Sequence, residues 1–426
     1  MTEINDKLKQ LMAQRGLMLG SQWRQERDKV EQQQQAARAR GDFEIDKCVP
    51  GELVENEAGA FYLVRTDFPL DTCQGGVPLG DIFSVAGEHI AFSACDEELA
   101  GFDPATAVFV DVETTGLAGG AGTTAFLVGA GYFTGDPPVF RLDQCFMRDF
   151  DDEEAMLLYL QDIFAGVETI VTFNGKTFDI PLLRSRFVSN RLPFRLDAAL
   201  HYDLIHAVRR IFKLRLKDCS LANVEREVLN IRRHGDIPGA EIPQVWFDYL
   251  RSRDAQVLPR VFNHHRNDVV SLVALAALIA QRLSVPCGDG FEHAEDRLSV
   301  VRLHHRQKKF EAVIEHARKL LECETDNCLR RECLCILCSA YKRMQDWQQM
   351  EEILNLMTRE FPSDLTARLE LAKYHEHRSR NLAEALRICH EALQICPAYD
   401  QGFIADFQRR KTRLERKLQK NRCEED

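Results

Sequence analysis

The stretch that decides the fold is Val108–Gly116, which reads VFVDVETTG. A run of β-branched and aromatic apolar residues is typical of a buried strand. Side chains of a strand alternate between its two faces, so Asp111 and Glu113 point the same way. Two adjacent carboxylates at the end of an apolar strand repel each other and resist losing their water. A bound divalent cation relieves both effects, because hard cations prefer carboxylate oxygens. The alternative is a strand that ends and leaves its two acids in water.

The sequence around this strand predicts an α/β domain over residues 106–284. Further apolar stretches are expected to form strands, and segments with helical spacing are expected to form helices. Strands that come first as a meander and then alternate with helices predict a mixed sheet flanked by helices. The expected strands are 108–112, 124–133, 140–147 and 169–173, and the expected helices are 152–164, 216–228 and 269–283.

Residues 297–420 are expected to form a second, all-α domain of helical repeats. Phe310, Trp347 and Leu382 each follow a polar turn, at a spacing of roughly 35–37 residues that indicates an array of helix hairpins. The third unit, LELAKYHEHRSRNLAEALRICHEALQICP, resembles a tetratricopeptide repeat. Such arrays usually bind partners or pack on a neighbouring domain. This region is also basic, with 25 Lys and Arg against 18 Asp and Glu between 297 and 422.

Composition narrows the class of protein. The net charge of -11 argues against a protein that coats nucleic acid nonspecifically. The first residues, MTEINDKLKQ, do not resemble a secretory signal, and no apolar run has the length of a membrane span. The 14 cysteines are scattered, which favours reduced thiols in the cytoplasm. Residues 1–42 are expected to be a polar helical or disordered lead-in, and 43–105 a small β-rich leader packed on the α/β domain.

Two further acids lie where a metal site would need them. Asp179, in FNGKTFDIPLL, follows a buried strand, and Asp268, in FNHHRNDVVSL, precedes an apolar helix. Taken singly, each is an ordinary helix cap or surface acid. Together with Asp111 and Glu113 they form an ordered set of four.

This set resembles the exonuclease motifs of the DEDD superfamily, which has a ribonuclease H-like fold. DVETTG, NGKTFD and HHRND supply the three motifs in order. The blocks GLAGGAGTTAFLVGAGYF, VTFNGKTFDIPLLRSRF, HYDLIHAVRR, GDIPGAEIP and HHRNDVVSL look like the bacterial YprB family, also called mitomycin repair factor B. That family joins an exonuclease-like domain to a C-terminal tetratricopeptide-like region.

The resemblance implies a two-metal phosphodiesterase. Asp111, Glu113, Asp179 and Asp268 would hold two divalent cations, Mg²⁺ or Mn²⁺, that activate a water and stabilise the leaving 3′ oxygen. The general base in one DEDD branch is a His five residues before the last Asp, and in the other a Tyr four before. Here His264 occupies the tyrosine-like position, and a histidine suits proton abstraction. His265 beside it is the other candidate, and a structural loop histidine is the alternative for both.

Substrate contacts are predicted at Thr114 and Thr115, which follow the acids, and at Asn174 and Lys176, which flank Asp179. Simple turn chemistry accounts equally well for the Asn-Gly pair. We interpret the glycine-rich run between Gly116 and Thr124 as a flexible loop at the mouth of the site. Two clusters keep two interpretations each. The basic residues between 209 and 217 either follow a nucleic-acid backbone or form a solvated helix face, and the cysteines between 323 and 338 either bind metal or fill repeat cores.

The resulting hypothesis is a cytoplasmic, metal-dependent 3′→5′ exonuclease, acting on DNA in a repair pathway, with RNA as a further possible substrate. The helical repeats are expected to dock a helicase or other repair protein, and no membrane partner is expected. The alternative, from a different class, is a non-catalytic module that grips DNA ends or a partner protein. An RNA-processing exonuclease is a third reading of the same motifs.

Overall fold

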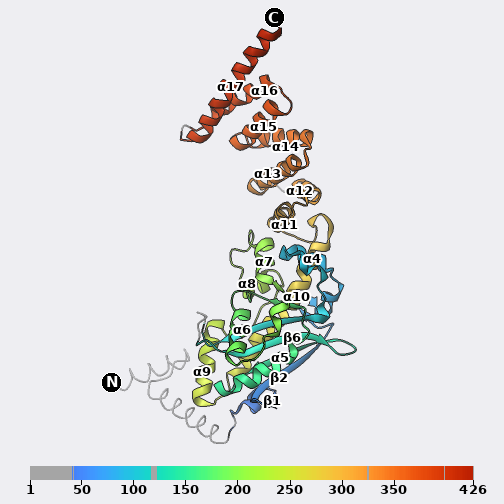
Figure 1. The fold of residues 1–426 in the computed structure, drawn as a ribbon, viewed down its shortest axis with the longest axis vertical. Coiled ribbons are helices and arrows are strands. Elements are labelled where there is room, and N and C mark those ends of the chain that lie inside the picture. The colour runs from blue at the N-terminus through green and yellow to red at the C-terminus, as the bar shows by residue number, and fades with distance from the viewer. Residues whose placement is uncertain (1–40, 42, 117–121, 324–325, 398, 426) are drawn as a thin grey trace, which may run out of the picture. The chain divides into compact units, whose positions relative to one another are not determined.

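A computed structural model describes residues 41, 43–116, 122–323, 326–397 and 399–425 (Figure 1). The predicted lead-in over 1–42 and much of the predicted mouth loop lie outside the described residues. By its internal contacts the chain divides into two units. Unit 1 contains 1–84, 102–204 and 228–275, and unit 2 contains 85–101, 205–227 and 276–426. Each unit therefore combines segments that are distant in the sequence. The domain ranges given above stay predictions.

The centre of unit 1 is a seven-stranded mixed sheet with the order β1-β2-β7-β6-β5-β8-β9. The neighbours from β1 to β5 are antiparallel, whereas β5, β8 and β9 are parallel. The predicted mixed sheet is thus confirmed. Its strands are β1 (Glu52–Asn56), β2 (Gly59–Pro69), β5 (Ala107–Thr114), β6 (Ala125–Thr134), β7 (Val139–Phe146), β8 (Thr169–Thr172) and β9 (Leu200–Asp203). A separate hairpin pairs β3 (Cys73–Gln74) with β4 (Val77–Pro78).

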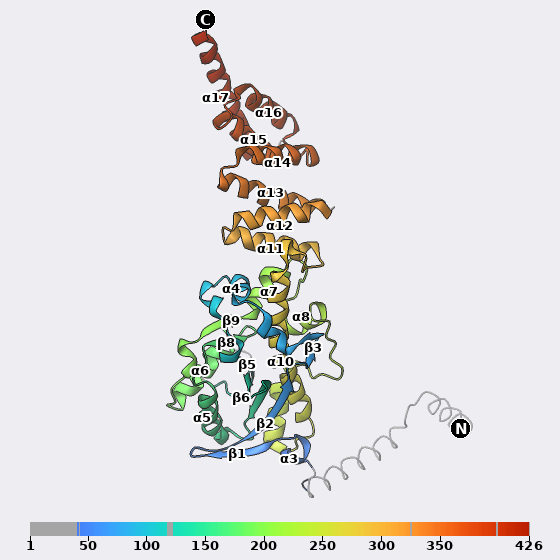
Figure 2. The same cartoon turned by 90° about the vertical axis from the view of Figure 1, so that its right-hand side faces the viewer.

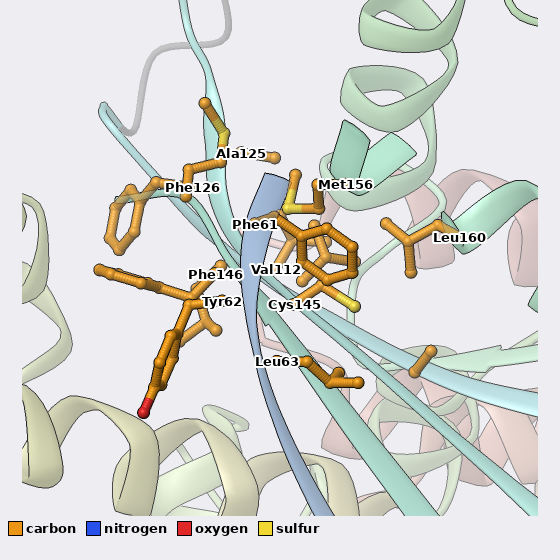
Figure 3. Packing of buried hydrophobic residues seen from close by; sticks show 14 of the residues in the cluster. Phe61, Tyr62, Leu63, Val112, Ala125, Phe126, Cys145, Phe146, Met156 and Leu160 are labelled. Atoms are coloured by element: carbon orange, nitrogen blue, oxygen red, sulfur yellow. The ribbon is translucent and has the colours of Figure 1, made fainter. Parts of the chain in front are cut away.

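Helices cover both faces of this sheet. On one face Tyr159 of α5 (Glu153–Ile163) lies 5.1 Å from Phe61, measured between ring centroids. On the other face Trp246 of α9 (Ile242–Ser252) stacks on Phe126 at 4.9 Å. Figure 3 shows the resulting core, with Met156 and Leu160 on one side of the strands and Phe126 and Phe146 on the other. Apolar residues on both faces of the central strands are what a sheet between two helical layers requires.

Helix α10 (Leu258–Ser284) begins about eleven residues before the predicted start at 269. Leu258, Val261, Phe262 and His265 are all buried, so the buried face of the helix extends through the residues before 269, where the sequence predicts no helix. Contrary to the expectation from sequence, α10 is long and apolar enough to span a membrane. Its most apolar window is 61% buried inside the protein, however, which is typical of a core helix.

Unit 2 contains a C-terminal region of stacked helix pairs, which confirms the predicted all-α architecture (Figure 2). The three repeat landmarks Phe310, Trp347 and Leu382 are each the first residue of a helix. Cys333 and Cys338 are buried in this core, and the cysteines form no metal-binding group among the described residues. The stacked helices are α11 (Ala294–Arg306), α12 (Phe310–Cys323), α13 (Asn327–Met344), α14 (Trp347–Glu360), α15 (Leu365–His377), α16 (Leu382–Ile395) and α17 (Gln401–Glu425).

The remaining helices are short. Helix α8 (Leu221–Glu227) covers only part of the predicted helix 216–228, because residues 213–215 form a turn and residues 216–220 are irregular. The α-helices are α3 (Ile45–Cys48), α4 (Gly87–Ala94), α6 (Asp179–Ser189), α7 (Leu204–Phe212) and α8 (Leu221–Glu227). The 3₁₀ helices are η1 (Leu79–Ser84), η2 (Glu97–Gly101), η3 (Pro104–Thr106), η4 (Phe150–Asp152), η5 (Arg195–Ala198), η6 (Gly239–Glu241) and η7 (Pro286–Gly288).

Candidate metal centre

Strand β5 places two carboxylates at the end of the central strand pair. Asp111 and Glu113 lie on one face of β5, while Val112 between them points into the core on the other face. The register between β5 and β6 shifts after Glu113, where the strand ends. The Asp111 side chain is 18% exposed. The pair that the sequence predicted on one face is therefore held against the apolar core, with only limited access to water.

Helix α10 brings two more candidate ligands to this pair. His264 and Asp268 are one helical turn apart, and the His264 Nε2 lies 3.4 Å from an Asp268 carboxylate oxygen. One donor atom each from Glu113, His264 and Asp268 lies within 4.8 Å of the other two. Bonds from a metal to oxygen or nitrogen are about 2.0–2.6 Å long, so donors that share one ion lie at most roughly 5 Å apart. These three residues fit a bound cation and form a candidate metal site.

Asp179 is positioned by a tight turn between β8 and α6. It is the first residue of α6, directly after the turn that contains Asn174 and Lys176. Asn174 has a φ of 70°, and its backbone N–H donates to Asp203 at 2.6 Å. The Lys176 N–H donates to the second Asp203 oxygen at 3.0 Å. Asp203 thus fixes the turn, and the main chain of both predicted phosphate contacts serves this structural role.

We call the carboxylates of Asp111, Glu113, Asp179 and Asp268 the acidic centre. Burial, followed by the charge of neighbouring acids, raises the pKa of Glu113 and of Asp179 well above the ordinary values. Burial also raises the pKa of Asp111 to about 6 and raises the pKa of Asp268, although Arg233 and His264 counteract part of this. Crowded acids whose charged forms are disfavoured are typical of functional sites. A cation bound here would stabilise all four carboxylates.

A third segment completes the site, and our sequence reasoning did not identify it. Arg233 forms an ion pair with Asp268, and its side chain is 11% exposed. Asp236 lies 2.9 and 3.0 Å from the His264 Nδ1 through its two oxygens. Burial alone would raise the pKa of Asp236, but His264 and Arg233 lower it. The only signal in the sequence was the block RRHGDIPGAEIP, which contains both residues.

Asp236 determines how His264 faces the acids. An ionised carboxylate can only accept hydrogen bonds, so the Nδ1–H of a neutral His264 donates to Asp236. The Nε2 of that tautomer carries its lone pair toward Asp268, where it can bind a metal or accept a proton. Carboxylates often orient metal-site histidines in this way.

His265 has a structural role. It is fully buried, its Nε2–H donates to the Asp111 carbonyl at 3.0 Å, and its Nδ1 accepts from Gln144 at 3.0 Å. Burial lowers its pKa to about 4, so the ring is neutral near pH 7. Gly129, the β6 partner of Asp111, leaves room for the ring, because a Cβ at this position would lie 2.6 Å from the His265 Cε1. The Nε2 bond supports the backbone that carries Asp111, and the Nδ1 bond to Gln144 of β7 fixes the orientation of the ring.

Thr114 and Thr115 form loop-closing hydrogen bonds. The Thr114 hydroxyl donates to the Gly116 carbonyl at 3.0 Å, and the Thr115 hydroxyl accepts from the Thr124 N–H at 3.0 Å. The bond between Thr115 and Thr124 holds the two ends of the segment 116–124 together, whereas the Thr114 bond is local to its first end. The predicted role of both threonines in substrate binding stays a prediction.

Comparisons with known proteins agree with this geometry. Residues 108–280 match the model of the RNase H superfamily, and this range contains every residue of the acidic centre. The chain is 29% identical over 325 residues to YprB of Bacillus subtilis (strain 168), a protein described as uncharacterized. The match covers 74% of this chain and 76% of the relative. The chain is therefore a YprB-like protein that carries a domain of the RNase H superfamily.

Proposed function

We propose that this protein is a metal-dependent exonuclease that hydrolyses DNA from the 3′ end in a cytoplasmic repair pathway. The observation that carries the proposal is the convergence of Glu113, His264 and Asp268, whose side-chain donor atoms lie within 4.8 Å of one another. The two acids can bind a cation, and His264 lies close enough to them to act as a base at that site. Besides burial, the charges of Asp111 and Asp179 raise the pKa of Glu113, so both acids act on the site that contains Glu113. A superfamily of nucleases supplies the fold, and the acids supply the cation site that phosphodiester hydrolysis needs.

Each residue has a role in this proposal. Asp111, Glu113, Asp179 and Asp268 would hold two divalent cations, Mg²⁺ or Mn²⁺. When bound, such ions activate water and stabilise the charge on the leaving oxygen. His264 accepts the proton of the attacking water through Nε2, and Asp236 keeps its Nδ1 protonated. Arg233 offsets part of the negative charge around Asp268 and leaves the remainder to attract divalent cations.

The test is a cleavage assay with the purified full chain. With Mn²⁺ or Mg²⁺, DNA labelled at its 5′ end should shorten stepwise from the 3′ end, and the same assay on RNA establishes the preferred sugar. EDTA should abolish cleavage, and so should the double variant Asp111→Ala/Glu113→Ala. The variant Asp151→Asn, at an exposed acid of η4, serves as the control. Equal cleavage by the double variant and the control would refute the assignment.

The alternative is a non-catalytic module that holds DNA ends or a partner. One observation favours a binding role beside catalysis, namely the stack of helices α11–α17, because stacked helix pairs present extended surfaces for binding. We therefore propose that this stack also docks a protein of the repair pathway, such as a helicase. Crosslinking of the full chain to a candidate helicase tests this role independently of cleavage. Crosslinks that map to α11–α17 would support it, and crosslinks confined to other segments would contradict it.

A further inference from the structure

A cationic cavity lies in unit 2, apart from the residues of the acidic centre. It has a volume of about 530 Å³ and is formed mainly by α7 and α11. Its lining contains five permanently charged cations and no carboxylate. The lining residues are His206, Arg209, Arg210, Lys213, Leu214, Ser299, Arg302, Leu303 and Arg306. We call this set the cationic cavity.

The framework around the cavity is fixed by contacts within unit 2. Arg210 donates to the Ser93 carbonyl of α4 at 3.0 Å. Arg215, just after α7, pairs with the buried Asp296 of α11 at 2.9 Å. Arg302 forms a bidentate ion pair with Glu332, with both distances at 2.6 Å. These bonds hold the backbones of α7 and α11 in place, so the cavity is a preformed feature of the unit.

Three of the cations have no acidic partner. Arg209, Lys213 and Arg306 are exposed, and none forms an ion pair with a carboxylate of the described residues. Arg209 in α7 and Lys213 directly after it are spaced i, i+4, as are Arg302 and Arg306 within α11, so the like charges of each pair repel each other. The negative ends of the helix dipoles favour one or two cations at the end of each helix. That effect alone does not explain why five cations converge on one cavity in a chain of net charge -11.

We propose that the cationic cavity binds backbone phosphates of the nucleic acid on which the protein acts. This inference rests on the proposed function. Exposed, unpaired cations on two neighbouring helices suit a strand that passes in water, since phosphate contacts supply most of the sequence-independent affinity for nucleic acids. Leu214, which is 38% exposed, and Leu303 add apolar surface for sugars or bases. The missing acids make the surface unsuitable for a cationic partner.

The test measures binding without catalysis. Anisotropy of a labelled DNA oligonucleotide is recorded in EDTA at several salt concentrations, for the full chain and for the variant Arg209→Gln/Lys213→Gln/Arg306→Gln. Each lost phosphate contact lowers the slope of log affinity against log salt by about 0.7 to 0.9, so the slope should fall by about 2 to 3. With equal affinities at 1 M salt, binding at 0.1 M salt should weaken on the order of 100-fold.

The matched control removes three exposed arginines from other helices, in the variant Arg343→Gln/Arg359→Gln/Arg416→Gln. It changes the net charge equally and should bind nearly as the wild type does. A cavity variant with the affinity and slope of this control would overturn the proposal. The single variant Arg306→Gln, with a slope lower by about 1, provides a second measurement that does not depend on the triple variant folding.

A small substrate separates this inference from the proposed function. The p-nitrophenyl ester of thymidine 5′-monophosphate has one phosphodiester and no further backbone phosphate to contact the cavity. The cavity variant should hydrolyse it at the wild-type rate in Mn²⁺ while losing activity on long DNA. If the wild type hydrolyses neither substrate, the proposed nuclease function fails, and the binding experiment in EDTA still decides the role of the cavity.

Discussion

The acidic centre should destabilise the metal-free protein, and the substitution Asp111→Asn tests this directly. Asn keeps the size of the side chain and removes its charge. Burial raises the pKa of Asp111 from 3.8 to about 6, and its side chain is only 18% exposed. The ionised form is therefore disfavoured in the folded protein relative to the unfolded chain. Without metal, the variant should be more stable than the wild type near pH 8.

The size and pH dependence of the effect follow from the pKa. A change from 3.8 to about 6 corresponds to about 3 kcal/mol, at roughly 1.4 kcal/mol for each pH unit. The pKa of Asp111 is higher in the folded protein than in the unfolded chain. The contribution of protonated Asp111 to the free energy of unfolding is therefore fully present below about pH 3.8 and is lost as the pH rises through about 6. The advantage of Asp111→Asn should thus be near zero at pH 4 and approach about 3 kcal/mol at pH 8.

The assay is thermal unfolding at both pH values, first in EDTA and then with Mn²⁺. For a unit of this size, about 3 kcal/mol raises the midpoint by roughly 6 to 12 °C. Mn²⁺ at about 1,000 times its Kd should stabilise the wild type by about 4.1 kcal/mol, which exceeds the advantage of the variant and reverses the order. The variant Asp151→Asn should behave as the wild type throughout. A less stable Asp111→Asn in EDTA at pH 8, or equal stabilisation of both proteins by Mn²⁺, would contradict the reasoning.

Three further outcomes are expected. In saturating Mn²⁺, His264→Ala should lower kcat about 10²- to 10⁴-fold, and Asp236→Asn should lower it about 10- to 100-fold. The Mn²⁺ concentration that gives half of the maximal activity should stay unchanged in both variants. A large rise in that concentration would instead make His264 a metal ligand. Gly129→Ala should cost about 1 to 3 kcal/mol in urea unfolding, because its Cβ would lie 2.6 Å from His265, and wild-type stability would show that the ring can move away. Glu376→Gln should lower the free energy of unfolding by about 3 kcal/mol above pH 4.5, since burial would raise the pKa of Glu376 but its cationic partners in α17 lower it to about 2. This loss of stability should disappear as the pH falls through about 2. A loss that persists below that pH would contradict the assignment.

Local pattern predicted the strands well. The continuous apolar run at Val108 indicated β5, and the segments that form β6, β7 and β8 follow the same logic. Period-two alternation explains why Asp111 and Glu113 could be placed on one face from their spacing alone. Helix boundaries were less accurate. The start of α10 was placed too late, because Asn263, His264 and His265 look polar although His265 is buried against the sheet.

The supports of the site were harder to predict, because they depend on contacts between distant parts of the chain. Asp236 and His264 are 28 residues apart, and Arg233 and Asp268 are 35 apart. No local periodicity relates such pairs. The structural role of His265 also depends on Gly129, which in sequence is only a glycine inside an apolar strand. The order in which strands pair is what brings these residues together.

The same contacts explain how an apolar sheet tolerates so many acids. His265 is neutral and supports the Asp111 backbone without adding charge, whereas Arg233 is cationic and contacts Asp268 directly. One arginine cannot balance four carboxylates, so the pKa values of Asp111, Glu113 and Asp179 stay raised. A fully neutralised site would be more stable but would have no affinity left for divalent cations. The partial compensation by Arg233 therefore leaves a negative charge that only a bound cation can satisfy, which ties the stability of the fold to the chemistry proposed for it.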